Sequence, residues 1–509
     1  MTQIRAVTRQ ADKLDAVSVE IDLSESFKAY DVRGIVGATI SAEAVEAIGA
    51  AFVDVLGLAG QDVLVGGDMR PSSPEFAAAF ARGAAYRGAN PKMLGLISTD
   101  ELYFAAGSLN SAGVVFTASH NPAAYNGIKM AKAGAVPVSS DTGLFDIRDL
   151  AQSYLDEGLP VSTEAPEGTI TEIDVLAGYA DYLRELVDLT GIRPLKVVVD
   201  AANGMGGLTT PAVLGDTLLP GLPLEIIEMY FELDGTFPNH PANPLEPENL
   251  RDLQAAVLKH GADIGLAFDG DADRCFVIDE KGQPVSPSAI TALVAVREIA
   301  RAQAAGEDTP VIIHNLITSR AVPEAVTAAG GRPVVTRVGH SFIKAVMAEQ
   351  GAVFGGEHSA HYYFRDFYNA DTGMLAAMHV LAALGHQDSP LSEFAAEYEP
   401  YVSSGEINSE VEDKAGAVAR VLEEFANGYD LNDEHSGFVC PPCHPDLADR
   451  ETIVSTMDGT TVTAADGSFW FNLRPSNTEP FLRYNGEAID RKTMELVRDG
   501  VLDIVRSNA

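Results

Sequence analysis

Three passages of this chain share one order of apolar and helical segments, and this repeat restricts the possible folds more than any other feature. Each passage begins with an apolar run of strand composition and continues through a predicted helix to a second apolar run. A third run then enters a polar loop, and the passages span 63–120, 197–274 and 311–361. Alternating strands and helices are typical of parallel α/β units. We therefore predict three similar α/β domains.

The third run of each passage leads into a loop rich in polar and ionisable side chains. In parallel sheets, ligands bind beyond the carboxyl ends of the strands. Three repeats of one plan would therefore direct their loops toward one central cleft. The loops read TASHNP at 117–122, DGDADR at 269–274 and GEHSAH at 356–361.

The segment after about residue 392 does not follow this repeat. It contains a predicted helix at 414–426, short predicted strands within 461–488 and a fourth polar loop, RPSNTEP, at 474–480. The predicted architecture is therefore three similar mixed α/β domains followed by a smaller α+β C-terminal domain around one central cleft. The predicted domains are 1–165, 166–285, 286–391 and 392–509.

Length and composition indicate a large folded protein. The chain has 509 residues, of which 46% are hydrophobic, enough for about three or four domains of about 100 to 200 residues. Its formal net charge of -38 argues against nucleic-acid binding, which needs a basic surface. It has only three cysteines, no apolar signal segment at its start and no apolar stretch of about 18 residues. We therefore expect a cytoplasmic protein without a disulfide framework or a membrane span.

The DGDADR loop places three carboxylates at alternate positions, Asp269, Asp271 and Asp273, directly after an apolar strand. Carboxylates that converge in a tight loop can hold a hard cation such as Mg²⁺. A calcium EF-hand is excluded, because its sixth position is Arg274 instead of glycine and the flanking segments have the composition of strands. The alternative is an acidic turn exposed to solvent.

The serine of the TASHNP loop follows a strand, as the nucleophile of many hydrolases does. Such a nucleophile needs Gly-x-Ser-x-Gly for its strained turn, whereas Ser119 lies between Ala118 and His120. The sequence therefore predicts a different role for Ser119.

The RPSNTEP loop combines one guanidinium with small neutral donors. The guanidinium of Arg474 offers a planar donor fork that matches phosphate. The same Ser, Asn and Thr residues are also common in ordinary turns. The loop is thus a candidate phosphate cradle, with the neutral donors Ser476, Asn477 and Thr478.

The GEHSAH loop carries a carboxylate, a hydroxyl and two histidines. Glu357 and Ser359 suit the vicinal hydroxyls of a sugar, and His361 could transfer a proton. Among the eleven histidines of the chain, those in strand-end loops are the candidates for function, namely His120, His340 and His361.

Together, these four loops resemble the four signature loops of the α-D-phosphohexomutases, in particular those of the bacterial phosphomannomutase/phosphoglucomutase branch. They occur in the family's order, and the resemblance extends from FKAYDVRG at 27–34 to the end of the chain. It implies that Ser119 carries a phosphoryl group and transfers it to a hexose phosphate. A hexose 1,6-bisphosphate would be the intermediate and the activator.

The resemblance also implies a role for individual residues. Ser119 and the three aspartates of DGDADR would bind Mg²⁺, while Lys129 and Arg274 would neutralise charge during phosphoryl transfer. His361 matches a general acid/base, and Lys129 is a second candidate. The implied catalytic residues are Ser119, Lys129, Arg274 and His361, the implied metal ligands are Ser119, Asp269, Asp271 and Asp273, and the implied substrate-binding residues are Tyr30, Arg33, His120, His340, Glu357, Ser359, Arg474, Ser476, Asn477 and Thr478.

Mannose is the favoured sugar, because GEHSAHYYFRDF and ADTG (370–373) are closer to mannose-directed relatives. The glucosamine branch usually has glutamine at the position of His358. The alternatives are a phosphoglucomutase, a sugar-phosphate phosphatase in which water takes the phosphoryl group, and a non-catalytic sugar-phosphate sensor. The expected partner is a hexose phosphate, and the expected state is a monomer or a homodimer.

Several residues also have structural alternatives. Lys129 could be a solvated surface lysine, and Tyr30 could pack between domains. Arg483 is expected to stabilise the last domain through an ion pair with an acidic neighbour. His358 is expected to shape its loop.

The segment at 433–450 is longer than the family pattern. Its CPPCH sequence would attach haem only in an exported protein. A zinc site is chemically possible there, and a plain loop is the alternative. The four candidate zinc ligands are His435, Cys440, Cys443 and His444.

Overall fold

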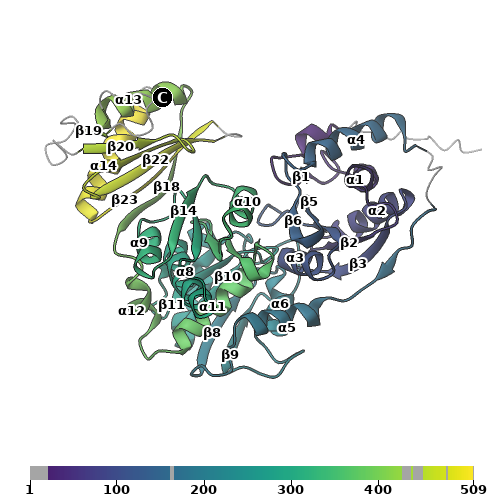
Figure 1. The fold of residues 1–509 in the computed structure, drawn as a ribbon, viewed down its shortest axis with the longest axis horizontal. Coiled ribbons are helices and arrows are strands. Elements are labelled where there is room, and N and C mark those ends of the chain that lie inside the picture. Colours follow the sequence, from purple (N-terminus) through teal and green to yellow (C-terminus); the bar gives the residue numbers. More distant parts are fainter. Residues whose placement is uncertain (1–20, 161–165, 427–436, 440–450, 477–479, 508–509) are drawn as a thin grey trace, which may run out of the picture.

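The chain forms four β-sheets with flanking helices (Figure 1). The computed structural model describes residues 21–160, 166–426, 437–439, 451–476 and 480–507. The first three sheets mix parallel and antiparallel strands, whereas the fourth is antiparallel throughout. This arrangement confirms the predicted three similar mixed α/β domains and the smaller α+β domain that follows them.

The first sheet has the strand order β1-β5-β4-β2-β3-β7, with β6 beside β5. Its strands are β1 (Val32–Ile35), β2 (Asp62–Gly67), β3 (Asn90–Leu96), β4 (Ala112–Phe116), β5 (Tyr125–Lys132), β6 (Val136–Pro137) and β7 (Thr171–Glu172). The helices around it are α1 (Ala42–Leu56), α2 (Ser73–Tyr86), α3 (Thr99–Ser108) and α4 (Leu144–Glu157).

The second sheet has the order β12-β11-β10-β8-β9. Its strands are β8 (Leu195–Asp200), β9 (Leu224–Met229), β10 (Ile264–Phe268), β11 (Cys275–Asp279) and β12 (Pro284–Val285). The helices in this part are α5 (Leu176–Leu186), α6 (Gly206–Val213) and α7 (Arg251–His260).

The third sheet has the order β14-β13-β15-β16-β17. Its strands are β13 (Val311–Asn315), β14 (Arg332–Thr336), β15 (Phe354–Gly356), β16 (Tyr362–Phe364) and β17 (Ala370–Asp371). The helices in this part are α8 (Pro287–Ala304), α9 (Ala321–Ala328), α10 (His340–Gln350), α11 (Gly373–Gly385) and α12 (Leu391–Ala396).

The fourth sheet has the order β18-β23-β22-β21-β20-β19. Its strands are β18 (Val402–Glu410), β19 (Gly437–Val439), β20 (Glu451–Ser455), β21 (Thr460–Ala464), β22 (Phe469–Pro475) and β23 (Phe481–Ala488), and its helices are α13 (Lys414–Phe425) and α14 (Arg491–Arg506). Short 3₁₀ helices are η1 (Leu23–Glu25), η2 (Ala133–Ala135), η3 (Pro247–Leu250) and η4 (Arg365–Phe367).

One arrangement of four strands recurs in the first three sheets, as β5-β4-β2-β3, β11-β10-β8-β9 and β16-β15-β13-β14. In each, the strand that enters the polar loop runs parallel to the first strand of its passage and is followed by an antiparallel return strand. The three polar loops therefore lie at the equivalent hairpins β4–β5, β10–β11 and β15–β16, which explains why they have the same place in each repeat.

The helix predicted at 414–426 is α13, which begins at the predicted residue and ends one residue earlier. Strands β10 and β11 flank the DGDADR loop, which confirms that it is not an EF-hand. None of the helices in the described residues is both long and apolar enough to span a membrane.

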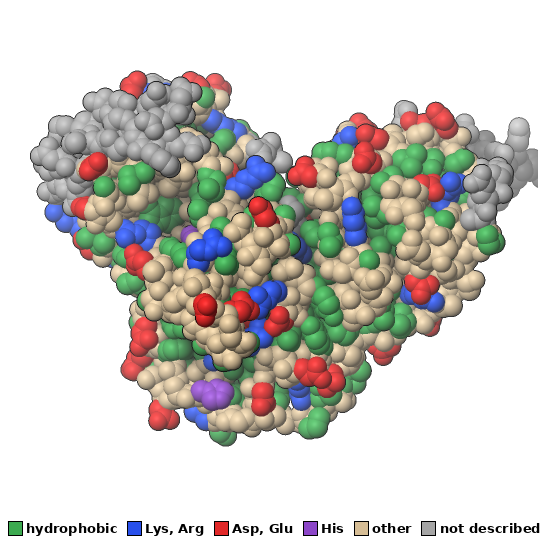
Figure 2. All heavy atoms as spheres, viewed as in Figure 1, with side chains coloured by type: hydrophobic (Ala, Val, Ile, Leu, Met, Phe, Trp, Pro, Cys, Tyr) green, Lys and Arg blue, Asp and Glu red, His purple; other side chains and the backbone are tan. Residues whose placement is uncertain are grey.

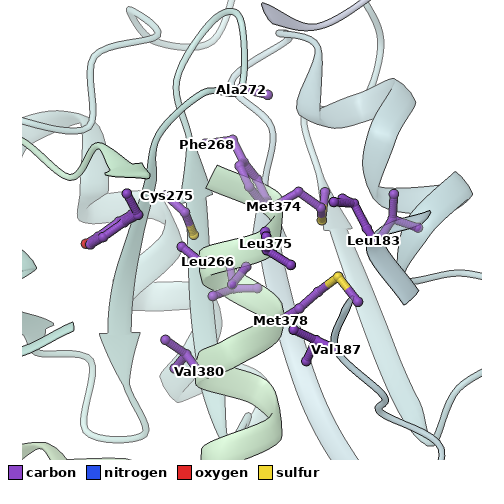
Figure 3. Packing of buried hydrophobic residues seen from close by; sticks show 14 of the residues in the cluster. Leu183, Val187, Leu266, Phe268, Ala272, Cys275, Met374, Leu375, Met378 and Val380 are labelled. Atoms are coloured by element: carbon purple, nitrogen blue, oxygen red, sulfur yellow. The ribbon is translucent and has the colours of Figure 1, made fainter. Parts of the chain in front are cut away.

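Helix α11 joins the second and third parts of the chain into one core. All of its residues are buried. Figure 3 shows Met374 and Met378 of α11 close to Leu266 and Phe268 of β10 and to Leu183 of α5. Helix α11 follows the third sheet in sequence but packs on the second. The second and third polar loops are therefore held in a fixed position relative to each other.

The fourth sheet has a hydrophobic core of its own, which includes Val421 of α13, Phe471 of β22 and Val501 of α14. Figure 1 shows this sheet (yellow) on the opposite side of the molecule from the first. The Arg483 guanidinium lies 3.6 Å from a Glu406 carboxylate oxygen on the neighbouring strand. This ion pair confirms the expected structural role of Arg483.

Two glycines within helices, Gly83 in α2 and Gly500 in α14, have different surroundings, which predicts opposite effects of their Gly→Ala changes. A Cβ on Gly83 would lie 1.9 Å from the Glu46 carbonyl oxygen. Gly83→Ala is therefore expected to destabilise the first domain by about 1–3 kcal/mol. A Cβ on Gly500 in α14 would meet only Phe425, at 3.4 Å, so Gly500→Ala is expected to stabilise its helix by up to about 1 kcal/mol. Differential scanning calorimetry measures both changes, and shifts of the same sign would contradict this account.

Candidate active site

Ser119 lies in the hairpin between β4 and β5, in a strained backbone conformation. Its φ of 48° is in the left-handed region, which costs a residue with a Cβ about 1–2 kcal/mol. The Ser119 N–H donates a hydrogen bond to Thr117 Oγ1 at 2.9 Å, which holds this conformation. Ser119 Oγ donates to Asp269 Oδ2 at 2.9 Å and accepts from Arg274 Nη2 at 3.3 Å. The hydroxyl is thus buried between a carboxylate and a guanidinium of the second loop.

Close packing of the first two loops depends on Gly270. A Cβ at this position would lie 2.4 Å from the Ser119 carbonyl oxygen. The second loop also contacts the backbone of Met205, whose N–H donates to the Gly270 carbonyl at 2.9 Å. Glycine therefore lets the carboxylates approach the serine.

The three aspartates of the second loop fit a divalent cation. One oxygen from each of Asp269, Asp271 and Asp273 lies within 4.8 Å of the others, and all three side chains are buried. Within the described part of the chain, Asp271 Oδ1 and Asp273 Oδ1 have no hydrogen-bond partner. Buried carboxylate oxygens need such a partner or a cation, so this donor set suits Mg²⁺.

Two cations of the protein lie among these carboxylates. Lys129 Nζ, on β5, is 2.7 Å from Asp271 Oδ2, and Arg274 Nη2 is 2.6 Å from Asp269 Oδ2. Burial raises the pKa of Asp269 to about 7, although Arg274 acts against this. Burial alone would lower the pKa of Lys129, but Asp271 and Asp273 raise it well above its ordinary value. Lys129 is thus a buried, protonated residue, and its surface alternative is wrong.

His361 of the third loop lies against the second loop. Its Nδ1 is 3.1 Å from Ser359 Oγ, and its Nε2 is 3.9 Å from Asp273 Oδ1. Residues Arg274 and His361 also form an isolated antiparallel bridge. Burial lowers the pKa of His361, which favours a neutral imidazole that can accept a proton.

Glu357 is held by neighbours on both of its oxygens. Its Oε1 accepts from Asn315 Nδ2 at 3.0 Å and from the Gly339 N–H at 3.3 Å, and its Oε2 accepts from the Tyr363 hydroxyl at 2.7 Å. His358 Nδ1 lies 3.1 Å from Ser288 Oγ, which agrees with a role in shaping the loop. The sequence did not point to Asn315 or Tyr363, because their link to Glu357 is a tertiary contact.

A buried ion pair lies beside His361. Lys344 Nζ of α10 is 2.6 Å from Asp371 Oδ1 of β17 and 3.8 Å from the centre of the Tyr103 ring. Asp371 also lies with Asp273 and His361 in a group whose potential ligand atoms are within 4.8 Å. Neither Lys344 nor Asp371 was predicted as a site residue.

The segment FKAYDVRG contacts the loop of Ser119. Arg33 Nε is 2.7 Å from Asp31 Oδ2, and its Nη1 donates to Asn121 Oδ1 at 3.0 Å. Burial and the nearby Asp31 raise the pKa of Tyr30, and the charges of Glu357 and Arg474 also act on it. Tyr30 is therefore within electrostatic reach of the third and fourth loops.

His120 contacts both the Ser119 hydroxyl and the Arg274 guanidinium. Its Nδ1 is 3.1 Å from Ser119 Oγ and 2.6 Å from Arg274 Nη2. Burial and the positive charge of Arg274 lower the pKa of His120 to about 2. The imidazole is therefore neutral and accepts the Arg274 hydrogen bond.

The fourth loop belongs to the C-terminal sheet, and Figure 2 shows a notch between that part and the first domain. Arg474 lies near the end of β22, and the Ser476 N–H donates to the Phe481 carbonyl at 2.9 Å. His340 is the first residue of α10. The remaining predicted residues lie outside the described residues; these are Asn477 and Thr478 and the candidate zinc ligands His435, Cys440, Cys443 and His444.

Arg70 is the main residue of this site that was not predicted. It is 1% exposed, and its guanidinium lies 3.3 Å from Asp68. It donates to four backbone carbonyls at 2.7 to 2.9 Å, those of Ser119, Asn121, Pro122 and Tyr125. Arg70 therefore determines the shape of the hairpin that carries Ser119.

The first turn of α3 contains two buried acids, Asp100 and Glu101, which predicts a pH dependence of stability. Burial raises the pKa of Asp100 to about 6 and that of Glu101 to about 8. An unfolded glutamate has a pKa of about 4.3, so the folded chain binds the extra proton between these values. This stability contribution is complete below the unfolded value and is lost as pH rises toward about 8, by up to about 1.4 kcal/mol per pH unit.

The variant Glu101→Gln tests this dependence. The amide keeps an oxygen that can accept from the Ser98 N–H, as Glu101 Oε2 does at 2.8 Å, but it does not titrate. Urea unfolding between about pH 5 and pH 8 should show a smaller loss of stability in Glu101→Gln than in the wild type. An unchanged slope would show that Glu101 does not titrate in this range.

All four parts of the chain match known domains. They match phosphoglucomutase/phosphomannomutase alpha/beta/alpha domain I at 24–155, domain II at 177–282, domain III at 286–401 and the C-terminal domain at 406–504. The chain belongs to the phosphoglucomutase/phosphomannomutase family. It is a phosphohexomutase, an enzyme that transfers a phosphoryl group within its substrate.

Individual relatives cover nearly the whole enzyme. The phosphomannomutase of Escherichia coli K12 is 37% identical over 466 residues, which are 91% of this chain and 94% of the relative. That of Salmonella montevideo is 37% identical over 485 residues, 94% of this chain and 99% of the relative. The crystal structure of a phosphoglucomutase/phosphomannomutase family protein from Burkholderia thailandensis superposes with a TM-score of 0.78 at 29% identity, covering 96% of this chain and 99% of the other.

Proposed function

We propose that this enzyme interconverts mannose 1-phosphate and mannose 6-phosphate, and the corresponding glucose phosphates, through phosphorylated Ser119 and a hexose 1,6-bisphosphate. The observation that carries the proposal is the position of Ser119 Oγ, 2.9 Å from Asp269 Oδ2 and 3.3 Å from Arg274 Nη2. Two relatives that are named phosphomannomutase support mannose as the main sugar.

In the first transfer, the free hydroxyl of the bound hexose phosphate attacks the phosphorus atom carried by Ser119. The new oxygen–phosphorus bond forms as the bond to Ser119 Oγ breaks, and the hydroxyl proton passes to His361. His361 suits this role better than Lys129, because burial favours its neutral form whereas the pKa of Lys129 is raised. Arg274 donates to Ser119 Oγ and so stabilises it as the leaving oxygen. The bisphosphate then turns, and its other phosphoryl group returns to Ser119 by the reverse step.

We propose Ser119, Asp269, Asp271 and Asp273 as the ligands of Mg²⁺. The bound ion would neutralise negative charge on the phosphoryl group. Lys129 adds positive charge on the same side of the loop, since it contacts both Asp271 and Asp273.

The sugar is expected to bind between the third and fourth loops. Glu357 and Ser359 would contact hydroxyls that glucose and mannose share, and the RPSNTEP cradle would bind the phosphate of either end. Because the cradle recognises phosphate and not the ring, it can hold the intermediate in both orientations. The proposed substrate-binding residues are Tyr30, Arg33, His120, His340, Glu357, Ser359, Arg474, Ser476, Asn477 and Thr478.

The remaining features of this proposal rest on the sequence alone. We expect hexose 1,6-bisphosphate to act as the activator, a cytoplasmic location, and a monomer or homodimer without nucleic-acid or membrane partners. The domain boundaries stay predictions, at 165/166, 285/286 and 391/392. Strand β7 lies after the first of these and pairs with β3, so the first sheet includes a strand from beyond that boundary.

Turnover of mannose 1-phosphate and glucose 1-phosphate tests this function, with Mg²⁺ and a catalytic amount of hexose 1,6-bisphosphate. Formation of the 6-phosphates is the expected result, and the ratio of the two kcat/KM values identifies the preferred sugar. Release of inorganic phosphate in place of the isomer would identify a phosphatase. No turnover of either sugar phosphate would contradict the proposal.

A further inference from the structure

The first turn of α3 contacts the metal-binding loop from a different part of the chain. The Thr99 hydroxyl donates to Asp271 Oδ2 at 2.5 Å, and the Thr99 N–H donates to the Asp271 carbonyl at 3.1 Å. Both residues are fully buried. Thr99 therefore holds the backbone and the side chain of one proposed ligand together.

These contacts give the two oxygens of Asp271 different surroundings. Oδ2 accepts hydrogen bonds from Thr99 and from Lys129 Nζ at 2.7 Å. Oδ1 has no hydrogen-bond partner among the described residues. A carboxylate held in this way by one oxygen presents the other to a cation in a single orientation.

The turn that carries Thr99 is itself fixed by three parts of the chain. Ser98 and Glu101 form a reciprocal cap at the start of α3. Asp100 Oδ2 accepts from the Tyr179 hydroxyl of α5 at 2.6 Å and from Thr372 Oγ1, which caps α11, at 2.7 Å. The position of Thr99 is thus set by elements that accompany all of the first three sheets.

We propose that Thr99 is a positioning residue for the divalent cation. Its hydroxyl orients Asp271 so that Oδ1 faces the ion, and Asp100 anchors the turn that carries it. Groups behind a metal ligand commonly change metal affinity by about 10- to 100-fold when they are removed. This inference rests on the proposed role of Asp271 as a ligand and assigns to Thr99 no contact with sugar or phosphoryl group.

The matched variants are Thr99→Val, which keeps the shape and loses the hydroxyl, and Thr99→Ser, which keeps the hydroxyl. Binding of Mn²⁺ without sugar is measured by the electron paramagnetic resonance of the free ion, and Mg²⁺ by competition. Thr99→Val is expected to weaken Mn²⁺ binding by about tenfold or more, with Thr99→Ser close to wild type. The Mg²⁺ concentration for half-maximal turnover should rise in Thr99→Val, while kcat at saturating Mg²⁺ changes less.

Several outcomes would overturn the proposal. These are wild-type Mn²⁺ affinity in Thr99→Val, an equal loss in both variants, or Mn²⁺ binding by the wild type that Asp271→Asn does not alter. Thr99→Ala is measured beside Thr99→Val, so that a fold that does not accept valine still gives a test of the hydroxyl. Because no sugar is present, Mn²⁺ binding that depends on Thr99 would support the inference even if turnover assays rejected the proposed substrates.

Discussion

Replacing Ser119 by alanine is expected to lower mutase turnover by at least about a thousandfold, because no other group can carry the phosphoryl group between the two ends of the sugar. The fold should persist, since the change removes one buried hydroxyl and leaves the Ser119 backbone bonds to Thr117 and Arg70 possible. Turnover of mannose 1-phosphate with added bisphosphate measures the effect.

The control for this variant is Ser111→Ala. Ser111 follows α3 in the same domain, and its hydroxyl bonds only to the nearby Leu109 carbonyl among the described contacts. It should keep wild-type turnover. Mutase activity in Ser119→Ala within tenfold of the wild type would reject Ser119 as the carrier.

Arg70→Met is expected to have the largest effect on stability, a loss of about 3–5 kcal/mol from the first domain. The change leaves the buried Asp68 without its 3.3 Å ion pair and removes the donors of four backbone carbonyls. Arg70→Lys keeps the charge but cannot reproduce the planar fork, so it should be less destabilised than Arg70→Met and still lose about a hundredfold in turnover.

Arg82→Met is the matched control for Arg70. Arg82 lies in α2 of the same domain and pairs with Glu46 at 2.8 Å, but its side chain is 55% exposed. Exposed pairs of this kind contribute about 0–1 kcal/mol. Thermal unfolding of both variants should therefore separate them clearly, and similar unfolding temperatures would contradict the role given to Arg70.

The sequence could predict the loops of this site because their chemistry is local. The aspartates of DGDADR, and Glu357, Ser359 and His361 of GEHSAH, stand at alternate positions directly after the apolar runs that form β10 and β15. The order of the segments also predicted the repeated α/β plan. The structure adds a feature that was not predicted, because each polar loop connects its strand to an antiparallel return strand.

The residues that support these loops could not be found in the same way, because their contacts are distant in sequence. Arg70 bonds to a carbonyl 49 residues away, Thr99 to a carboxylate 172 residues away, and Thr372 to Asp100 across 272 residues. One signal was available. Arg70 follows β2 and Thr99 follows β3, as Ser119 follows the parallel strand β4. Ligands bind beyond the carboxyl ends of parallel strands, and applying this principle to every strand would have included both residues.

The most direct test of the central claim is the location of the phosphoryl group during turnover. The enzyme is mixed with excess glucose 1,6-bisphosphate, freed of unbound ligand and digested for mass spectrometry, before and after a chase with mannose 1-phosphate. We expect one phosphoryl group on the peptide that contains Ser119, and its transfer to the sugar on the chase. A Ser119 that never carries phosphate, or that releases it only to water, would contradict the account.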